Sequence, residues 1–464
     1  MIFRLATLVL LGSGLSAVSA FAAESTPTKK HALADVIDLA LRNRSTVGVA
    51  QQSFISAAQG KTVARSPLLP QAVTTFNMLR GRSVGAQSGT NFRFSGDLNS
   101  EQGTLNASWA FDGGGNYWRF RQTTHSIRSA RAGIATAANS VRLEASLAYF
   151  EVLRAQQLLD QAKSNQRIAE AQLDMIRARI KVGDAAPVDE LPVRVQVENA
   201  KVQVLQALNT VRTNASSLRD QIGLDYGPPL DLEDLPEPKN LDAAPLVRYL
   251  DAALSGRPDL IQARTDILTN LYSYRAAKVA VFPTLTLNYG NLQGFGSFSS
   301  LRNQWSWQAF VSVPVLNWGS PAATAKQSLT VVRSSELTAG QLRKDIAAQV
   351  EQSYLSMTNA NERIAASHVE VDAAQKNLDA ANAKYRLGAS VTVVDVVQAQ
   401  VQLNQARTNL LTAIYDFYGA QANLEFSVGL GTELRNYNRT LDLRRLLADQ
   451  PPAGKATKST PAKN

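Results

Sequence analysis

The clearest pattern along the chain is a run of apolar residues in its second half that recur at alternating spacings of three and four positions. The members of this run are Leu403, Ala406, Leu410, Ala413, Phe417, Ala420 and Leu424. Their mean spacing of about 3.5 residues is the period of coiled-coil packing. The first half holds the same register at Val204, Ala207, Val211 and Leu218, interrupted by Asn214. Both runs therefore predict helices that pair along their length.

Each run follows a long segment that has no proline and consists mostly of good helix formers. The two segments are residues 116–182 and 322–387. At 1.5 Å per residue, a helix of this length reaches roughly 100 Å. Each segment ends at a glycine, Gly183 or Gly388, that follows basic residues and is a usual helix stop. We therefore expect two long helical hairpins.

Two pairs of segments alternate between apolar and polar residues with a period of two. The segments with clear alternation are residues 104–111, 284–289 and 304–313, and residues 73–79 alternate less cleanly. Alternating segments with aromatic residues near their ends are typical of membrane β-barrel strands. A half-buried hairpin of a soluble protein would alternate in the same way. The connecting loops are expected at residues 81–103 and 290–303.

Four strands do not span a bilayer as an open sheet, because the unpaired backbone groups at its edges would lie in hydrocarbon. Closure of the sheet therefore needs further copies of the chain. Two copies would supply eight strands, about the number at which side chains fill the barrel interior. Three copies would supply twelve strands and leave room for a lumen, so three is the preferred number.

The two halves of the chain are copies of one design. Tyr149 and Tyr354 are 205 residues apart, and beyond the helix-ending glycines the offset is 206, as for Asp189 and Asp395. Each half is predicted to run as helix, strand, loop, strand, long helix, turn and long helix. The resulting division is a signal peptide at 1–23, a first repeat at 24–224, a linker or equatorial segment at 225–245, a second repeat at 246–430, and a C-terminal equatorial segment with a disordered tail at 431–464.

The expected signal peptide is the N-terminal apolar run, which is too short to span a membrane and is followed by Ala20-Phe21-Ala22. The chain has no cysteine, which excludes disulfides, thiolate metal sites and a cysteine nucleophile. Its formal charge is +10, but the basic residues are spread along polar helices and alternate with acidic residues. The charge therefore does not indicate nucleic-acid binding. No catalytic constellation, cofactor motif or metal-ligand spacing is present, and we expect no enzyme activity.

The chain resembles the TolC family of outer-membrane efflux proteins, the outer membrane factors, over nearly its whole mature length. The residues that carry the resemblance are Arg257-Pro258-Asp259, Pro70, Pro283, Phe111-Asp112-Gly113-Gly114, Tyr385-Arg386-Leu387-Gly388 and Asp395-Val396-Val397. The resemblance implies a mainly α fold with a membrane β-barrel portion. Four strands and long coiled-coil helices per protomer would close as a homotrimer, giving a twelve-stranded barrel and a twelve-helix periplasmic tunnel.

The same resemblance implies a passive exit duct of a tripartite efflux or type I secretion system, in the outer membrane of a Gram-negative bacterium. The partners would be outer-membrane lipid, a periplasmic adaptor, and an inner-membrane RND or ABC transporter that supplies the energy. Adaptor docking maps onto the two helical turns, at Val182, Gly183, Asp184, Leu387, Gly388, Ala389 and Ser390. A plain turn would contain the same residue types.

The family also places acidic residues just inside the tip of the tunnel, where they face the lumen. Asp395 matches such a position and Asp189 is its partner in the first repeat. Gln398 stands where some members carry a second acid. Ser390 stands where the family is expected to have a basic residue that can hold the gate of the tunnel closed. A ring of three Asp395 carboxylates would favour cationic cargo. A solvated acid at a helix end would look the same in sequence.

Two alternatives remain open at this point. The helices alone are equally compatible with a periplasmic structural coiled coil that has no barrel. Within the family, the residues do not distinguish a duct for drugs, metals or solvents from a duct for proteins, nor which adaptor and pump class it serves.

Overall fold

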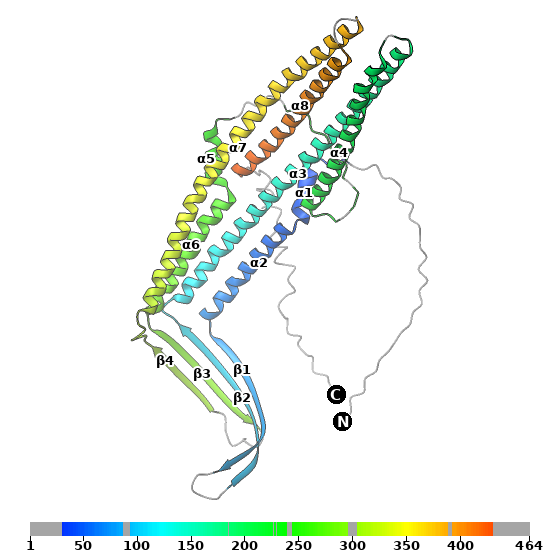
Figure 1. The fold of residues 1–464 in the computed structure, drawn as a ribbon. Coiled ribbons are helices and arrows are strands. Elements are labelled where there is room, and N and C mark those ends of the chain that lie inside the picture. Colours follow the sequence, from blue (N-terminus) through cyan, green and yellow to red (C-terminus); the bar gives the residue numbers. More distant parts are fainter. Residues whose placement is uncertain are drawn as a thin grey trace, which may run out of the picture.

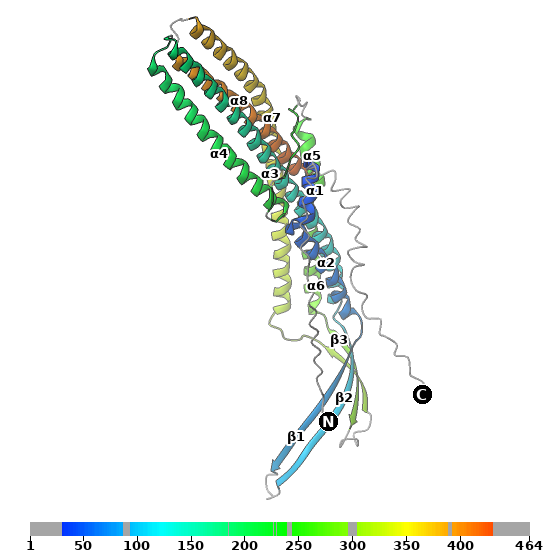
Figure 2. The ribbon, with the colours of Figure 1, turned by 90° about the vertical axis from the view of Figure 1, so that its right-hand side faces the viewer.

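The chain forms a bundle of long helices that stands on one end of a single antiparallel β-sheet (Figures 1 and 2). The computed structural model describes residues 30–86, 93–183, 185–225, 227–228, 230–238, 244–295, 304–387 and 392–429. The predicted signal peptide and the C-terminal segment at 431–464 lie outside these residues. Within them, no helix is long and apolar enough to cross a membrane.

Among the described residues, each half of the chain contributes four α-helices and two strands in the same order. The first half contains α1 (Leu33–Asn43), α2 (Ser45–Arg65), β1 (Gln71–Ala86), β2 (Arg93–Phe111), α3 (Gly115–Lys181) and α4 (Glu190–Ile222). The second half contains α5 (Leu246–Gly256), α6 (Pro258–Lys278), β3 (Thr284–Phe295), β4 (Gln304–Ser312), α7 (Ser320–Arg386) and α8 (Val393–Val428). Short 3₁₀ turns, η1 (Ser66–Leu68), η2 (Pro187–Asp189) and η3 (Val279–Val281), lie at the junctions.

The two long helices match their expected bounds to within two residues, because the proline-free, alanine- and leucine-rich segments favour helix throughout. The strands differ from expectation. β1 continues to Ala86, β2 begins at Arg93 and β3 continues to Phe295, so much of the two segments expected to be loops is strand. The glycine- and serine-rich sequence hid this extension. Paired antiparallel strands satisfy each other's backbone groups whatever their side chains are.

The expected single helix before each strand pair is two helices, broken at Arg44 and Arg257, which both have extended backbone. Pro258 explains the second break, because the residue before a proline avoids helical geometry. At the first break, the guanidinium of Arg44 donates a hydrogen bond to the carbonyl oxygen of Asp220 at 2.9 Å. Arg257, which is 6% exposed, donates likewise to the carbonyl oxygen of Ser427 at 3.1 Å. Each arginine thus caps the end of α4 or α8, where helix carbonyls lack partners.

The end of α4 meets the start of α2, and the end of α8 meets the start of α6, so that each pair forms a nearly continuous rod (Figure 1). Gly223 and Gly429, which end α4 and α8, have φ values of +73° and +74°. A Cβ atom at Gly223 would lie 3.1 Å from the carbonyl oxygen of Asn43, and one at Gly429 would lie 3.3 Å from the Cα of Arg257. Both the left-handed backbone and the close approach therefore require glycine.

Apart from the short α1 and α5, which pack beside the long helices, the described helices form a single layer at each level of the molecule. In the half nearest the strands, α2 contacts α3, α3 contacts α6, and α6 contacts α7. In the half farthest from the strands the order is α4, α3, α8 and α7 (Figures 1 and 2). Of the described helices, only α3 and α7 run through both levels. The helical layer therefore has two edges, formed by α2 and α4 on one side and by α7 on the other, and α5 packs against part of α7.

The acidic, proline-rich segment between the repeats is packed against the helices. Leu232 is 4% exposed and pairs with His31 in a β-bridge. The Tyr149 hydroxyl donates to the carbonyl oxygen of Glu233 at 2.5 Å, and the Tyr418 hydroxyl donates to that of Pro236. Burial raises the pKa of Tyr149 to about 12, so this hydroxyl keeps its proton at physiological pH. The segment therefore joins α3 and α8 near the middle of the molecule.

Candidate functional site

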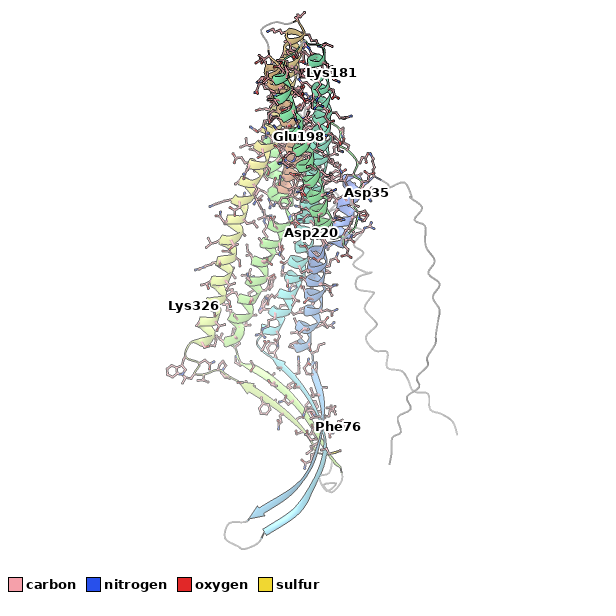
Figure 3. All side chains as sticks on the ribbon, turned by 45° about the vertical axis from the view of Figure 1, so that its right-hand side comes forward. Asp35, Phe76, Lys181, Glu198, Asp220 and Lys326 are labelled. Atoms are coloured by element: carbon pink, nitrogen blue, oxygen red, sulfur yellow. The ribbon has the colours of Figure 1, made fainter. Side chains whose placement is uncertain are left out.

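The two hairpin turns lie at the end of the molecule farthest from the strands, where Figure 3 labels Lys181. Val182 and Leu387 follow the last residues of α3 and α7 and are 79% and 84% exposed. Gly183 has a φ of +79°, which confirms its expected role as the residue that stops the helix. Asp184, Gly388, Ala389 and Ser390 lie outside the described residues. The described part of the tip thus presents two large apolar side chains to solvent.

An aromatic contact joins the two hairpins close to the tip. The guanidinium of Arg179, in the last turns of α3, lies 4.8 Å from the centre of the Tyr385 ring on α7. Tyr385 also packs against a small core that includes Ile176 and Val193. In the sequence, the basic residues here indicate only the end of a helix, because their spacing does not reveal a partner on another hairpin.

Asp395 occupies the first turn of α8 and is exposed. Its carboxylate accepts hydrogen bonds from the backbone amide of Thr392 at 2.7 Å and from the Thr392 hydroxyl at 2.8 Å. These hydrogen bonds lower the pKa of Asp395 below its ordinary value, because they stabilise the charged form. The arrangement is a capping box, which satisfies free amide groups at a helix start. Asp395 therefore has a structural role in addition to any role in a lumen.

Asp189 repeats part of this geometry in the first half. Its carboxylate accepts a hydrogen bond from the backbone amide of Ala186 at 3.2 Å. Ala186 is the repeat partner of Thr392, but it has no hydroxyl to add a second bond. The following residue, Glu190, is paired with Arg177 of α3 at 2.9 Å. Both predicted gate acids thus begin the returning helix of their hairpin.

Gln398 lies one turn after Asp395 on the same exposed face of α8. The exposed residues on this part of the helix are Val394, Asp395, Gln398, Val401 and Gln402. The opposite face carries the buried Val396, Ala399 and Leu403 of the α7–α8 coiled coil. The structure therefore places Asp395 and Gln398 together on an exposed face of α8, where Gln402 accepts a hydrogen bond from Asn377 of α7 at 3.2 Å.

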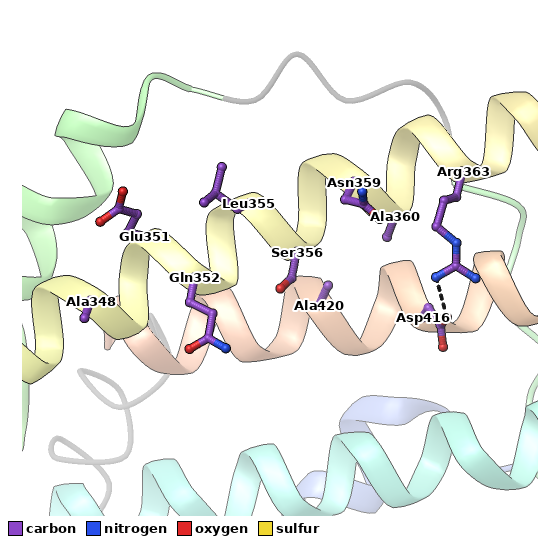
Figure 4. A pocket seen from close by; sticks show the side chains of 10 residues that line it. All are labelled: Ala348, Glu351, Gln352, Leu355, Ser356, Asn359, Ala360, Arg363, Asp416 and Ala420. Atoms are coloured by element: carbon purple, nitrogen blue, oxygen red, sulfur yellow. Dashed lines mark hydrogen bonds and ion pairs between the residues drawn. The ribbon is translucent and has the colours of Figure 1, made fainter.

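A charged group that no sequence motif marks lies farther along the same hairpin. Asp416 of α8 pairs with Arg363 of α7 at 3.0 Å and with Arg154 of α3 at 3.7 Å. It borders a groove of 660 Å³ on α7 and α8 (Figure 4). Asp416 precedes the buried Phe417 in the predicted coiled-coil run, which was the only sequence signal that it lies beside a helix contact.

The sheet has the strand order β1-β2-β3-β4, with every neighbouring pair antiparallel. Trp109 faces Leu287, and Tyr289 faces Trp307, across the strand pairs. These residues share one apolar face, on which Trp307 is 70% exposed. The strand register also resolves the unclear alternation of β1: Phe76 lies opposite Gly103 and therefore on the apolar face (Figure 3).

The other face of the sheet is mainly polar. Its members in the ladder include Thr75, Thr104, Asn106, Ser108, Thr286, Asn288, Ser306 and Gln308. The outer sides of β1 and β4 pair with no described strand. The sheet thus combines an exposed apolar face, a polar face and two open edges.

Comparison with known proteins identifies relatives over most of the chain. The model of the family described as "Outer membrane efflux protein" matches residues 36–224 and 249–430. The chain is 23% identical to the alkaline protease secretion protein AprF of Pseudomonas aeruginosa, over 86% of the chain and 84% of that protein. It is 24% identical to the outer membrane protein TolC of Vibrio cholerae, over 82% of the chain and 86% of that protein.

A likeness of fold accompanies these matches. The CmeC outer membrane channel of Campylobacter jejuni superposes with a TM-score of 0.78 at 15% identity, covering 89% of this chain and 90% of that one.

Proposed function

The chain belongs to the outer membrane efflux protein family, and from this premise we propose that three copies of it close into the exit duct of a tripartite export system. The protein is an outer membrane component of efflux or secretion, with the channel-tunnel fold of its structural relatives. Family members work as trimers with periplasmic adaptors and inner-membrane pumps. The trimer, the adaptor and the pump are proposed here for this chain.

The observation that carries the proposal is the four-stranded sheet with two open edges and one exposed apolar face. Because an even number of antiparallel strands separates the edges, β4 of one copy would run antiparallel to β1 of the next. That pairing would satisfy the edge backbone groups, which lipid cannot do. The apolar face with its aromatic residues would then meet lipid, and the polar face would line the lumen.

The edges of the helical layer support the same assembly. Along α4, Val195, Val202 and Leu205 are exposed at spacings of seven and three, which fit a coiled-coil seam. On the opposite edge, Leu355 and Val369 of α7 are exposed fourteen residues apart, again a multiple of 3.5. Packing of one edge against the other would bury both stripes and continue the layer around a tunnel. A periplasmic coiled coil without a barrel gives no reason for the exposed apolar sheet face.

The assembly is tested with the full-length purified protein. An unheated gel sample is expected to run as an oligomer that heat converts to monomer, and mass photometry in detergent should give three chains. The same preparation should form ion-conducting channels in a planar bilayer. A protein that stays monomeric and soluble without detergent would contradict the proposal.

At the tip formed by the helical turns, we propose that three Asp395 carboxylates face the lumen and favour cations. Asp395→Asn is expected to lower the cation-over-anion permeability ratio by about two-fold or more, because each copy loses one charge near the narrowest part of the path. The reversal potential under a salt gradient in a planar bilayer measures this ratio. Asp38→Asn, the same change on α1 far from the tip, is the control. An unchanged reversal potential for Asp395→Asn would remove Asp395 from the lumen.

The pH dependence of this selectivity follows from the lowered pKa of Asp395. A carboxyl group with a lowered pKa is charged above that pKa and loses its charge only as the pH falls through it. The Asp395 contribution to cation preference should therefore be constant between about pH 8 and pH 5.

A further inference from the structure

An apolar pocket lies where the helices meet the strands, at the end of the bundle opposite the tip. Its volume is 670 Å³, and it lies between α6, the first turns of α7 and the start of α3. Its apolar wall includes Trp118, Val281, Phe282 and Leu329. Its lining includes none of the candidate residues Val182, Asp189, Leu387, Asp395 and Gln398.

Three cationic residues stand around this apolar wall: Arg275 and Lys278 from α6, and Lys326 from α7 (Figure 3 labels Lys326). The pocket lining contains no acidic residue, and none of the three cations forms an ion pair with a described residue. The guanidinium of Arg275 is held by aromatic rings, 5.2 Å from the centre of Trp118 and 5.0 Å from that of Tyr272. The pocket thus offers an apolar floor and an uncompensated positive rim.

The helix dipole accounts for only some of these charges. Lys278, at the C-terminal end of α6, is favoured by the helix dipole. Lys326, however, lies in the second turn of α7, near the end where the dipole disfavours a cation. The first repeat places cations at the equivalent positions, Arg65 at an offset of 213 and Arg121 at an offset of 205. Both halves therefore carry a basic pair at the same level.

The surroundings of the pocket have the character of a membrane interface. The turn before α7 exposes Val315, Leu316 and Trp318, the last to 90%. Trp318 has a φ of +49°, whereas its repeat partner is Gly113. A bulky residue in left-handed backbone is strained, yet its side chain lies in solvent rather than in a core. Tryptophan and basic residues together are typical of the level where hydrocarbon meets water.

We propose that this pocket binds an anionic phospholipid of the periplasmic leaflet. An acyl chain would lie along Trp118, Phe282 and Leu329, and the phosphate would lie among Arg275, Lys278 and Lys326. The pocket is not closed by any described element, and its combination of an apolar floor with a cationic rim matches the two ends of such a lipid. The inference rests on the proposed function in one respect, that the sheet lies in the outer membrane.

The test uses delipidated full-length trimer in detergent, titrated with phosphatidylglycerol or with phosphatidylcholine of the same chains, with bound lipid counted by native mass spectrometry. The wild-type protein should retain phosphatidylglycerol in preference to phosphatidylcholine. The exposed double substitution Lys278→Gln and Lys326→Gln should lower its retention about 10- to 30-fold, since each cation near a lipid surface contributes about 1 kcal/mol. Ala325→Trp, which fills the pocket, should lower retention of both lipids. Lys344→Gln, farther along α7, is the matched control.

Equal retention of the two lipids by wild type, or no change in the double variant, would overturn the inference. Displacement of phosphatidylglycerol by inorganic phosphate would also overturn it, because the site would then recognise phosphate alone. The heat-labile trimer and channel conductance are measured on the same preparations. Intact trimers that conduct but show no lipid preference would reject the lipid site alone, whereas the absence of trimers would reject the proposed function.

Discussion

Ala309→Arg should abolish assembly of the protein in the outer membrane, whereas Gln308→Arg in the adjacent position should be tolerated. Ala309 lies near the middle of β4, opposite Leu287 on the apolar face, and Gln308 lies on the polar face. An arginine facing lipid near the bilayer centre costs about 2–4 kcal/mol, and three copies would carry it. An arginine facing a wet lumen avoids that cost. The measurement is the amount of heat-labile oligomer in the outer-membrane fraction.

The two substitutions introduce the same side chain at neighbouring positions of one strand. The β-strand propensity and the expression level should therefore differ little between the two variants. Equal tolerance of both arginines would mean that the apolar face does not meet lipid. Equal loss of assembly would mean that β4 is packed on both faces. Either result would contradict the proposed duct.

Leu387→Glu should abolish export while leaving the trimer intact. Leu387 is exposed at the end of α7, so a carboxylate there disturbs no core. Docking of an adaptor on the tip would bury this side chain, and burial of an unpaired charge is strongly unfavourable. Export of the partner pump's substrate is measured in cells, together with trimer yield and channel conductance.

Leu387→Met is the matched control, because it retains an apolar side chain of similar size and should retain export. The lack of cysteine offers a direct contact measurement as well. A single cysteine introduced at Leu387 can carry a photoreactive cross-linker and should capture the adaptor. Full export by Leu387→Glu would remove the tip from the docking surface.

Several elements could be predicted because local sequence determines them. The long α3 and α7 follow from uninterrupted helix-forming residues. The end of α3 at Gly183 follows from the position of this glycine after a basic last turn. Strand extension beyond the alternating segments could not be predicted, since the ladder between β1 and β2 depends on pairing rather than on side-chain pattern. The break at Arg44 was missed for a similar reason: no proline follows it, and the partner that holds it, Asp220, is 176 residues away.

The features of the candidate site could likewise be predicted only in part from the sequence. Asp395 was found because a motif marks it, but its hydrogen bonds to Thr392, and therefore its lowered pKa, depend on the capping geometry. The contact of Arg179 with Tyr385 and the pairing of Asp416 with Arg363 and Arg154 join different helices. Spacing along one helix contains no information about such partners.

By itself, the sequence determined the duplicated design, the two long hairpins, the alternating strands and the family, because these follow from periodicity and order along the chain. The tertiary structure alone decided which faces of the strands align, how Arg44 holds the end of α4 at α2 and Arg257 the end of α8 at α6, and where cations gather around the pocket beside Trp118. Those features depend on distances between residues that are remote in sequence, and such distances are fixed only when the helices and strands pack.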